Sequence, residues 1–335
     1  MVGQEDRQQL PQPILVTGAL GFIGRRLVTR LAEAGAKVIA SDLASTADAG
    51  WPSHVRYAAC DVRDAEALES LVRQARTLFH LAAIVGDWGT EAAHRAITVE
   101  GTEHVLRGAL ASQRECRVVL ASSIVVYGGQ LGRLRCHERL AMGRTFGPYS
   151  RSKQAQERLA RRFGEQGLDV RIVRPANVYG AGSKPWVTEL CRELERGTPA
   201  LVGGGDFDAG LVHVDNVVEV MLRAAGEAGA RGGVYNAADE DGVTWRRYMT
   251  DLASITGCRP PRSIPRPVAR LVAAVGEGTY RALGAARRPP LTREALNLVG
   301  SRHQICMRKA RSELDYRPVT DYESGLREIE LSLQI

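Results

Sequence analysis

The sequence predicts an α/β fold, in which a doubly wound parallel sheet is followed by a smaller C-terminal substrate-binding lobe. Short, nearly continuous apolar segments alternate with helical patterns through the first two-thirds of the 335 residues. Apolar segments of this kind are typical of parallel strands that helices cover on both faces. A glycine-rich turn at 17–24 joins the first predicted strand to the first predicted helix, as in folds of the Rossmann type.

The predicted elements follow one another in the order that such a sheet requires. The apolar segments predict strands at 14–18, 36–42, 55–61, 77–83, 117–123 and 170–176. Helices are predicted at 21–35, where apolar residues recur at helical spacing, and at 64–74, which begins with acidic residues as helix N-termini favour. A further strand and helix at 211–225 and a strand at 234–239 are expected to return to the main sheet.

The regular pattern ends in the second half of the chain, where glycine and proline interrupt it. We therefore expect a Rossmann domain that comprises 13–176 and 211–239, and a lobe that comprises 177–210 and 240–330. The polar residues 1–12 are expected to form a flexible tail.

The composition is that of a globular protein and argues against several classes of function. The net charge of +7 comes from arginines spread along the chain rather than gathered in one segment, so we expect no nucleic-acid partner and favour an anionic substrate or cofactor. No apolar run is long enough for a membrane span, and the polar N-terminus is unlike a signal peptide. The six cysteines are scattered without a CxxC pair, which predicts a cytoplasmic protein with neither disulfides nor a metal site.

The glycine-rich turn predicts a dinucleotide site. Gly18 permits a tight turn, Gly21 lets the backbone approach a pyrophosphate at the helix N-terminus, and Gly24 allows the helix to pack closely on the sheet. Asp42 ends the second predicted strand, where it is placed to bind the adenine ribose hydroxyls. An acid there would repel a 2′-phosphate, so NAD is favoured and NADP is the less favoured alternative.

Tyr149 and Lys153 are spaced by one helical turn, which predicts a proton-transfer pair. A phenol has an ordinary pKa of about 10, too high for a base at neutral pH. A lysine ammonium on the same helix face and the positive nicotinamide of NAD⁺ would favour the phenolate. Tyr149 would then take the proton of a substrate hydroxyl as hydride leaves the adjacent carbon. The alternative is an ordinary solvated pair on a helix.

Several segments together resemble the extended short-chain dehydrogenase/reductase family, in its epimerase/dehydratase and 3β-hydroxysteroid dehydrogenase-like branch. They are TGALGFIG (17–24), HLAA (80–83), SSIVVYG (122–128), YSRSK (149–153) and RPANVYGAG (174–182). The resemblance implies an NAD-dependent enzyme that acts on CH–OH groups.

In this family the resemblance makes Ser123, Tyr149 and Lys153 the catalytic residues. Ser123 would bind the reacting oxygen, and Lys153 would also hold the nicotinamide ribose. The resemblance further implies cofactor contacts from Tyr149 and Lys153 and from a larger set of residues, namely Gly18, Gly21, Phe22, Ile23, Gly24, Asp42, Asp61, Val62, Leu81, Ala82, Ala83, Ser122, Pro175 and Val178. Asp61 is equally consistent with a helix cap. Thr98 departs from the family, which often has asparagine there.

The residues after Ser123 argue against dehydration. Sugar-nucleotide dehydratases of this family carry an Asp-Glu pair there, whereas this chain has Ile124 and Val125. Two substrate classes stay open. Asn177 resembles an asparagine of nucleotide-sugar epimerases, but Asp206 and Asp208 would repel a diphosphate. We therefore favour a bulky, hydrophobic, 3β-hydroxysteroid-like alcohol or ketone over nucleotide-sugar 4-epimerisation, and treat Asn177 as more consistent with a loop-positioning hydrogen bond.

The remaining expectations concern the substrate and partners. Val85, Trp88, Val125, Asn177 and Trp186 are the candidate substrate contacts. The apolar segment 267–283 is interpreted first as a packed helix of the lobe, with a lid or a peripheral membrane contact as alternatives. The family resemblance also implies a homodimer through helices near 92–112 and 149–165. A non-catalytic cofactor-sensing regulator is a further alternative, disfavoured because the Tyr–Lys pair is retained. His213 and Asp215 are interpreted as strand-end and helix-capping residues rather than as a metal site.

Overall fold

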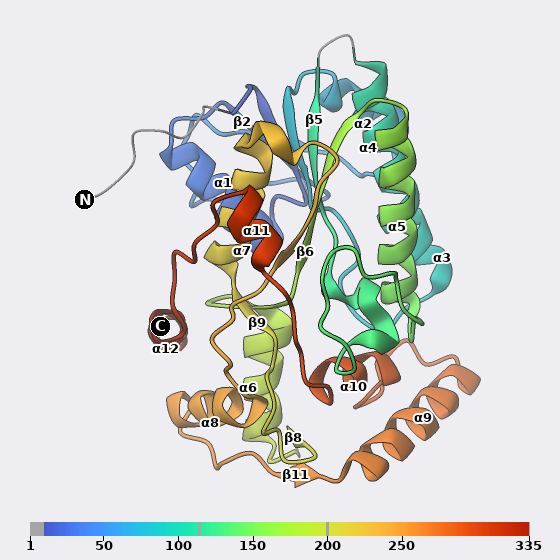
Figure 1. Ribbon diagram of the computed structural model, residues 1–335, viewed down its shortest axis with the longest axis vertical. Helices are drawn as coiled ribbons and strands as arrows, with labels where there is room; N and C mark the ends of the chain where they lie inside the picture. The colour runs from blue at the N-terminus through green and yellow to red at the C-terminus, as the bar shows by residue number, and fades with distance from the viewer. Residues whose placement is uncertain (1–9, 113–114, 199–200, 335) are drawn as a thin grey trace.

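The computed structural model describes residues 10–112, 115–198 and 201–334, so most of the predicted tail at 1–12 lies outside the described residues. Its centre is a seven-stranded sheet in the order β10-β6-β5-β4-β1-β2-β3 (Figure 1), in which every neighbouring pair of strands is parallel. The strands are β1 (Ile14–Thr17), β2 (Val38–Asp42), β3 (Arg56–Ala59), β4 (Thr77–His80), β5 (Arg117–Ala121), β6 (Asp169–Pro175) and β10 (Val234–Ala237). The predicted doubly wound fold is confirmed.

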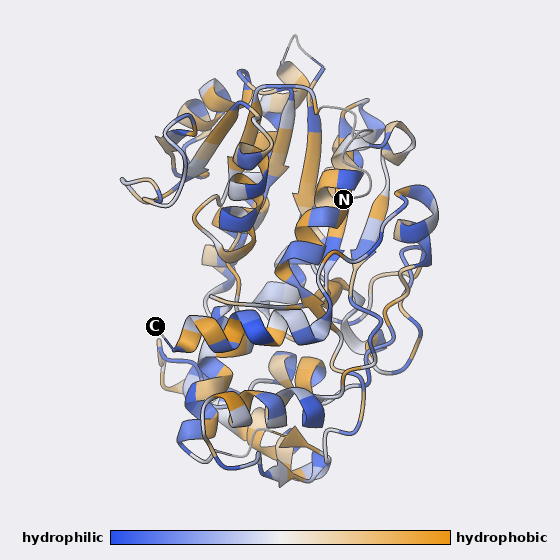
Figure 2. Cartoon of the chain, turned by 90° about the vertical axis from the view of Figure 1, so that its left-hand side faces the viewer, coloured by the Kyte–Doolittle hydropathy of each residue, from blue (hydrophilic) through white to orange (hydrophobic). Residues whose placement is uncertain are grey.

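Helices cover both faces of this sheet because its strands are apolar on both sides. In β1, Ile14 and Val16 point into one buried cluster and Leu15 points into the other, as the two-residue period of a strand requires. The hydropathy colouring of Figure 2 shows these strands as predominantly hydrophobic. The first cluster is completed by α1 (Phe22–Glu33) and α7 (Val214–Gly226), and the second by α2 (Ala65–Val72), α4 (Gly101–Ala111) and α5 (Pro148–Glu165).

The remaining elements complete this domain and form the lobe. They are α3 (Glu91–His94), η1 (Arg95–Glu100), η2 (Ile124–Gln130), β7 (Asn177–Tyr179), η3 (Lys184–Thr188), α6 (Glu189–Glu195), β8 (Leu201–Val202), β9 (Leu211–His213), η4 (Ala228–Ala230), α8 (Trp245–Ile255), β11 (Ser263–Ile264), α9 (Arg266–Ala282), α10 (Arg293–Val299), α11 (Arg308–Glu313) and α12 (Tyr322–Leu333). Of these, η1 and η3 are π-helical and η2 and η4 are 3₁₀-helical.

One predicted strand pairs elsewhere. β10 joins the main sheet next to β6 as expected, but β9 pairs with β7 in a separate two-stranded ladder, so the expectation that 211–213 returns to the main sheet is wrong. The Asn177 backbone N–H donates to Gly210 O, which draws β7 and the start of β9 together after β6 has ended. β10 instead occupies the place beside β6.

The lobe has its own core beyond the carboxyl ends of the strands. Aromatic and aliphatic side chains of α6, α8 and α12, with Trp245 and Tyr248 of α8 among them, form a third buried cluster together with Tyr179 of β7. α9 and α10 continue the lower edge of the molecule in Figure 1. The segment 305–316 packs instead into the main cluster, where Met307 and Leu314 are buried, although it lies within the range predicted for the lobe. Throughout residues 10–112, 115–198 and 201–334, no helix has the length and apolar character that crossing a membrane demands.

Candidate active site

The glycine-rich turn lies between β1 and α1, and its glycines are required by space. Gly18 has φ +70°, and a Cβ there would lie 2.7 Å from the Ala82 backbone nitrogen. A Cβ on Gly24 would lie 2.2 Å from Gly18 O. Gly21 is the N-cap of α1 and has no side chain to satisfy the first backbone N–H groups of the helix. The backbone at this helix N-terminus therefore suits an anion such as a pyrophosphate.

Asp42 borders the same turn from the end of β2. Its carboxylate accepts hydrogen bonds from Leu20 N at 2.9 Å and from Leu43 N at 2.7 Å. These bonds hold the carboxylate beside the turn, which is the position the sequence predicts for an acid that contacts a ribose.

The three predicted catalytic residues lie together at the carboxyl end of β5. Ser123 follows β5 and caps η2, and its side chain lies near enough to the Tyr149 phenol to lower the pKa of that phenol. Tyr149 lies in the first turn of α5, and Lys153 lies one turn further along the same helix. The Lys153 ammonium is buried and donates to Ala121 O at 2.8 Å and to Gln156 Oε1 at 3.0 Å.

Burial decides the proton affinities of this pair. It raises the pKa of Tyr149 to about 12, against the effect of the Ser123 hydrogen bond, and the Glu294 carboxylate raises the pKa further. It also lowers the pKa of Lys153 to about 7, which the Glu157 carboxylate opposes. The expectation that neighbouring charges lower the pKa of Tyr149 is therefore not met by the protein side chains, because desolvation of the phenolate outweighs them. The expectation also included the positive charge of a nicotinamide, which no side chain supplies.

A buried polar network continues from Lys153 toward the glycine-rich turn. Gln156 Nε2 donates to Thr102 Oγ1 at 2.8 Å, and His80 Nε2 lies 2.9 Å from the same oxygen. Because the Thr102 hydroxyl donates to Thr98 O, His80 Nε2 must be the donor, which leaves its Nδ1 to accept from Thr17 Oγ1 at 2.7 Å. Burial lowers the pKa of His80 to about 3, which agrees with a neutral ring.

This network fixes the Lys153 ammonium relative to β1. The sequence marked His80 only as part of the 80–83 segment, and it gave no signal for Thr102 or Gln156, whose roles depend on packing between helices. The Thr98 hydroxyl accepts from Ile84 N at 3.2 Å, so the residue that departs from the family holds the loop after β4.

A buried ion pair between Arg174 and Glu157 joins β6 to the catalytic helix α5. Arg174 donates to Glu157 through Nε at 2.8 Å and through Nη2 at 2.7 Å, and both side chains are almost fully buried. Ser122 Oγ donates to the same carboxylate at 2.6 Å. The Ser122 hydroxyl is thus engaged with Glu157, whereas the sequence predicted it as a cofactor contact. Glu157 lies four residues after Lys153, a spacing that could have identified it.

The other predicted cofactor residues surround the turn and the ends of the strands. Asp61 follows β3 and pairs with Arg63, which lowers the pKa of Asp61. Its alternative role as a helix cap is wrong, because Asp64 caps α2 by accepting from Ala67 N at 3.1 Å. The remaining ones are Phe22 and Ile23 in the first turn of α1, Val62 after β3, Leu81, Ala82 and Ala83 after β4, Pro175 at the end of β6 and Val178 in β7.

The predicted substrate residues do not form one group. Trp88 Nε1 donates to Ala285 O at 3.3 Å, so Trp88 lies against the end of α9. Trp186 packs on Trp245, with ring centroids 5.5 Å apart, and belongs to the core of the lobe. Asn177 is buried and donates to Ala209 O at 2.7 Å, which agrees with the loop-positioning role.

Two valines complete the predicted set. Val125 is buried two residues after Ser123 and donates its N–H to Ser123 Oγ at 3.3 Å. Val85 is 70% exposed in the loop after β4. Val125 is therefore close to the catalytic serine, while Val85 lies at the surface.

Two residues that the sequence did not single out lie close to Tyr149. His94 of α3 is buried, with its ring centroid 6.5 Å from that of Tyr149. Burial lowers the pKa of His94, although the Trp88 backbone favours the charged form. Glu294 of α10 is buried and accepts from Ser150 N at 2.7 Å.

A separate cavity of about 660 Å³ lies between the end of β10 and the loops before β9 and α11. Its lining carries four carboxylates and two guanidinium groups, namely Asp206, Asp208, Asp239, Glu240, Arg135 and Arg302. Burial raises the pKa of Asp239 to about 7. None of the three catalytic residues lines this cavity.

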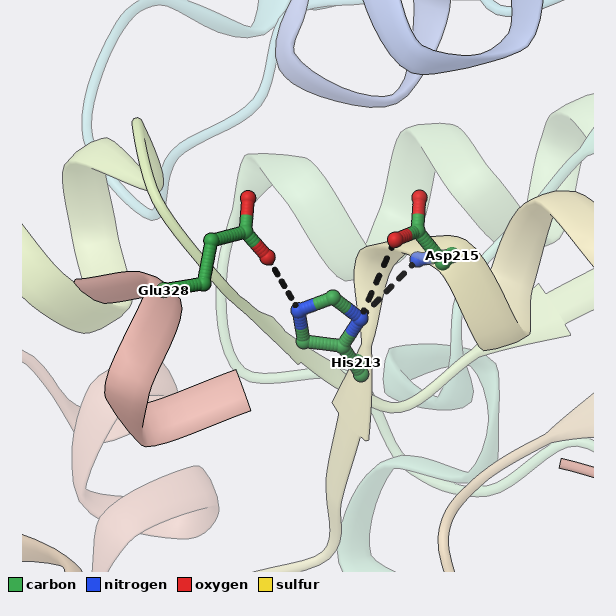
Figure 3. A group of neighbouring side chains, drawn as sticks. All are labelled: His213, Asp215 and Glu328. Atoms are coloured by element: carbon green, nitrogen blue, oxygen red, sulfur yellow. Dashed lines mark hydrogen bonds and ion pairs between the residues drawn. The ribbon is translucent and has the colours of Figure 1, made fainter. Parts of the chain in front are cut away.

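His213, Asp215 and Glu328 form the group of the described residues with metal-ligand spacing, shown in Figure 3. His213 caps α7, since its Nδ1 accepts from Asp215 N at 3.3 Å, and its Nε2 lies 3.1 Å from Glu328. Arg26 lies against both carboxylates. These contacts use both ring nitrogens and join α1, α7 and α12. They agree with the predicted capping role, and the absence of a metal site stays a prediction.

The chain is similar to known proteins along nearly its whole length. Residues 14–238 match the family model described as NAD dependent epimerase/dehydratase. The 4-hydroxy-2-methyl-3-oxo-4-farnesyl-3,4-dihydroquinoline-1-oxide ketoreductase of Stigmatella aurantiaca is 30% identical over 316 residues, 93% of each chain. The 2-alkyl-3-oxoalkanoate reductase of Stenotrophomonas maltophilia is 26% identical over 95% of this chain and 98% of its own. Among solved structures, MoeE5 in complex with UDP-glucuronic acid and NAD is 29% identical with a TM-score of 0.75, covering 96% of this chain and 99% of that chain.

Proposed function

The chain belongs to the NAD-dependent epimerase/dehydratase family, and we propose that it interconverts a ketone and a secondary alcohol on a bulky, hydrophobic substrate, with NAD as the hydride carrier. Tyr149 is the general acid and base in this proposal. Ser123 binds the reacting oxygen, and Lys153 holds the nicotinamide ribose. The observation that carries the proposal is that Ser123, which follows β5, lies with Tyr149 and Lys153, which are one helical turn apart on α5, and that the Lys153 ammonium is buried and donates to Ala121 O.

The geometry suits proton transfer to a carbonyl oxygen. When bound, NADH supplies the hydride that reduces the carbonyl carbon. The raised pKa of Tyr149, about 12, keeps the phenol protonated at neutral pH and therefore ready to donate to the developing alkoxide. Ser123 already reaches the phenol and can donate a second hydrogen bond to the same substrate oxygen. The proton affinities therefore favour ketone reduction at neutral pH and alcohol oxidation at alkaline pH.

A hydrophobic substrate is favoured over a sugar nucleotide for two reasons. The amide nitrogen of Asn177, the residue that resembles the diphosphate contact of an epimerase, is committed to Ala209 O. The two named relatives are ketoreductases whose names specify a farnesyl or an alkyl group next to a ketone. A 3β-hydroxysteroid or its ketone falls in the same chemical class.

Nucleotide-sugar 4-epimerisation is the second candidate. The observation that favours it is the similarity to MoeE5, whose structure holds UDP-glucuronic acid and NAD. A 4-epimerase would use the same Ser123, Tyr149 and Lys153, so the two candidates differ in the substrate rather than in the catalytic groups.

A substrate panel separates these candidates. The protein is incubated with NADH and 2-alkyl-3-oxoalkanoate or 3-ketosteroid probes, with NAD⁺ and 3β-hydroxysterols, and with UDP-hexoses, while NADH absorbance and sugar composition are followed. We expect cofactor turnover with the hydrophobic probes. Interconversion of UDP-sugars without net change in NADH would reject the first candidate in favour of the second.

The preference for NAD over NADP rests on Asp42 and on the two arginines that follow the glycine-rich turn. Arg25 contacts Leu20 O and Asp48, and Arg26 contacts Glu328. Both guanidinium groups are thus engaged with oxygen acceptors. The carboxylate of Asp42 remains the charge that would meet a 2′-phosphate, and it would repel that group.

We also propose that α9 contacts a membrane surface. α9 packs against the lobe through Ala269, Ala273 and Glu277, as predicted for a lobe helix. Its other face carries an apolar stripe at helical spacing that is 43% to 75% exposed, formed by Val268, Leu271, Val272, Val275 and the following Leu283. The contact would rest on this apolar stripe, since the guanidinium groups of Arg266 and Arg281 lie over the rings of Phe207 and Trp88. Co-sedimentation with phosphatidylglycerol vesicles should be lost on Leu271→Ser, and unchanged co-sedimentation would reject the contact.

Cytoplasmic location and a homodimer through α4 and α5 complete the proposal. Leu110 at the end of α4 is 39% exposed and would be covered in such a dimer. Sedimentation equilibrium at micromolar protein tests the dimer, and a monomeric mass would reject it.

A further inference from the structure

α9 and α10 of the lobe close over the start of the catalytic helix α5. Glu294 Oε1 accepts from Ser150 N at 2.7 Å, and Asn297 Nδ2 donates to Gly128 O at 3.0 Å. The Thr292 hydroxyl, which caps α10, donates to Asp87. The last third of the chain thus contacts both segments that carry the catalytic residues, the one after β5 and the first turn of α5.

Glu294 supplies a helix cap that α5 lacks in its own sequence. The N-cap of α5 is Gly147, which has no side chain, and the first turn contains no acidic residue. Helix N-termini favour a carboxylate because their first backbone N–H groups are unpaired. Glu294 provides that carboxylate from a position 144 residues later in the chain.

The fit around the carboxylate is close. Glu294 is 3% exposed, and its Oε2 has no hydrogen-bond partner among the described residues. A Cβ on Gly147 would lie 1.9 Å from Oε2, so only glycine at this position leaves room for the carboxylate. A buried carboxylate oxygen without a partner is costly, which suggests that the position of its charge serves the site.

The charged groups around Glu294 do not neutralise it. Arg288 is paired with Asp87 through bonds of 2.5 and 2.7 Å, and Arg151 is paired with Glu91. Burial and the Asp87 charge raise the pKa of Glu294 to about 7, whereas the bonds from Ser150 and the charge of Arg151 lower it.

On the α9 side, Glu277 accepts from Arg293 N at 2.6 Å and Nε at 2.7 Å, so that guanidinium is also occupied. The helix turn that carries Tyr149, one residue before the Ser150 N–H that donates to Glu294, therefore lies against a carboxylate without a dedicated cation. The charge of Glu294 raises the pKa of Tyr149.

We propose that Glu294 is a positioning residue of the active site, through which the C-terminal lobe holds the helix turn that carries Tyr149 and places a negative charge beside the phenol. This inference rests on the proposed function, in which Tyr149 is the general acid and base. A negative charge beside the phenol favours its protonated form, the form that reduces a ketone. Any opening of the lobe would remove both the hydrogen bond and the charge.

The test compares pH profiles of kcat/KM for oxidation of the alcohol found by the substrate panel. Glu294→Gln keeps an oxygen for Ser150 N but removes the charge. The increase of kcat/KM for oxidation should therefore occur about one pH unit lower than in the wild type, which is equivalent to about tenfold more phenolate at a given pH. Glu66→Gln is the matched control, because Glu66 is an exposed first-turn carboxylate of α2. It should leave the profile unchanged.

A second variant covers a failure of Glu294→Gln to fold. Glu294→Asp keeps the charge but withdraws the oxygen from Ser150 N, so kcat should fall by roughly tenfold while the profile stays in place. An unmoved profile in Glu294→Gln, or an unchanged kcat in Glu294→Asp, would overturn the inference. Tyr149→Phe in the same assay separates a failure of the proposed function from a failure of the role of Glu294. An active Tyr149→Phe variant rejects the proposed function. An inactive Tyr149→Phe variant, together with an unmoved pH profile of Glu294→Gln, rejects only the role of Glu294.

Discussion

Replacing Glu157 by glutamine should destabilise the protein far more than an ordinary loss of charge. Arg174 is 1% exposed, and its Nε and Nη2 both donate to Glu157, which is itself fully buried. Removing one partner of a buried pair leaves the other charge uncompensated, at a cost of about 3–5 kcal/mol. Arg174 keeps a hydrogen bond of 3.0 Å to the Tyr127 hydroxyl and lies over the Tyr127 ring. We therefore expect the free energy of unfolding to fall by about 3 kcal/mol, the lower end of this range.

The assay is urea unfolding at pH 7.5, followed by circular dichroism, with Glu103→Gln as the control. Glu103 pairs with Arg107 across one turn of α4 at the surface, so its loss should cost only about 0.3–0.5 kcal/mol. A cost for Glu157→Gln below about 1 kcal/mol would refute the reasoning, because it would place this pair in the range of exposed ion pairs.

Glu157→Gln should also affect activity through Lys153. The Glu157 carboxylate raises the pKa of Lys153 against the effect of burial, so its loss lowers that pKa further below the ordinary value of a lysine. The ammonium is then lost at lower pH. Ketone reduction should accordingly begin to fall at a lower pH than in the wild type, and a profile that does not move would contradict this connection.

Three further predictions concern the cofactor site and Glu294. Asp42→Asn should raise the catalytic efficiency with NADPH relative to NADH by about tenfold, because the charge that repels a 2′-phosphate is lost; an unchanged ratio in steady-state kinetics would contradict it. Gly24→Ala should abolish NADH binding measured by fluorescence, since its Cβ would lie 2.2 Å from Gly18 O, and normal affinity would show that the turn is less constrained. The raised pKa of Glu294, about 7, means that the folded state binds its proton more tightly than the unfolded state, so its contribution to stability is complete below about pH 4.5 and is lost as the pH rises toward 7. Urea unfolding at pH 5 and pH 8 should show a loss of up to about 3 kcal/mol in the wild type that Glu294→Gln lacks, and equal losses in both would argue against a buried, titrating carboxylate.

The main sheet could be predicted from the sequence because parallel strands are buried on both faces. Residues such as Ile14, Leu15 and Val16 must all be apolar, since each points into one of the two cores. The pairing of the strands could not be predicted as well as their positions. Leu211 and Val212 are as apolar as residues of the other strands, but β9 pairs with β7 rather than with the main sheet, and so short a segment carries no information about which edge it joins.

The parts of the candidate site that could be predicted are those whose residues lie close together in the sequence. The glycine turn and the Tyr149–Lys153 pair have a fixed spacing, so the sequence identified them, and the structure brings Ser123 to the same place. Burial raises the pKa of Tyr149, and spacing does not reveal burial; the predicted lowering depended in part on the charge of a bound nicotinamide.

Contacts between distant segments could not be predicted either. Glu294 has the position of a common first-turn acidic residue of its own helix, and nothing in the sequence connects it with Ser150. The same holds for Thr102 and Gln156, which meet only because α4 and α5 pack side by side.

The central claim is that Tyr149 transfers the proton, and Tyr149→Phe tests it most directly. NADH binding is measured by fluorescence titration and turnover by NADH absorbance with the substrate found by the panel. We predict unchanged affinity for NADH and a loss of at least about 100-fold in kcat, the contribution typical of a positioned general acid. Turnover within a few-fold of the wild type would contradict the account.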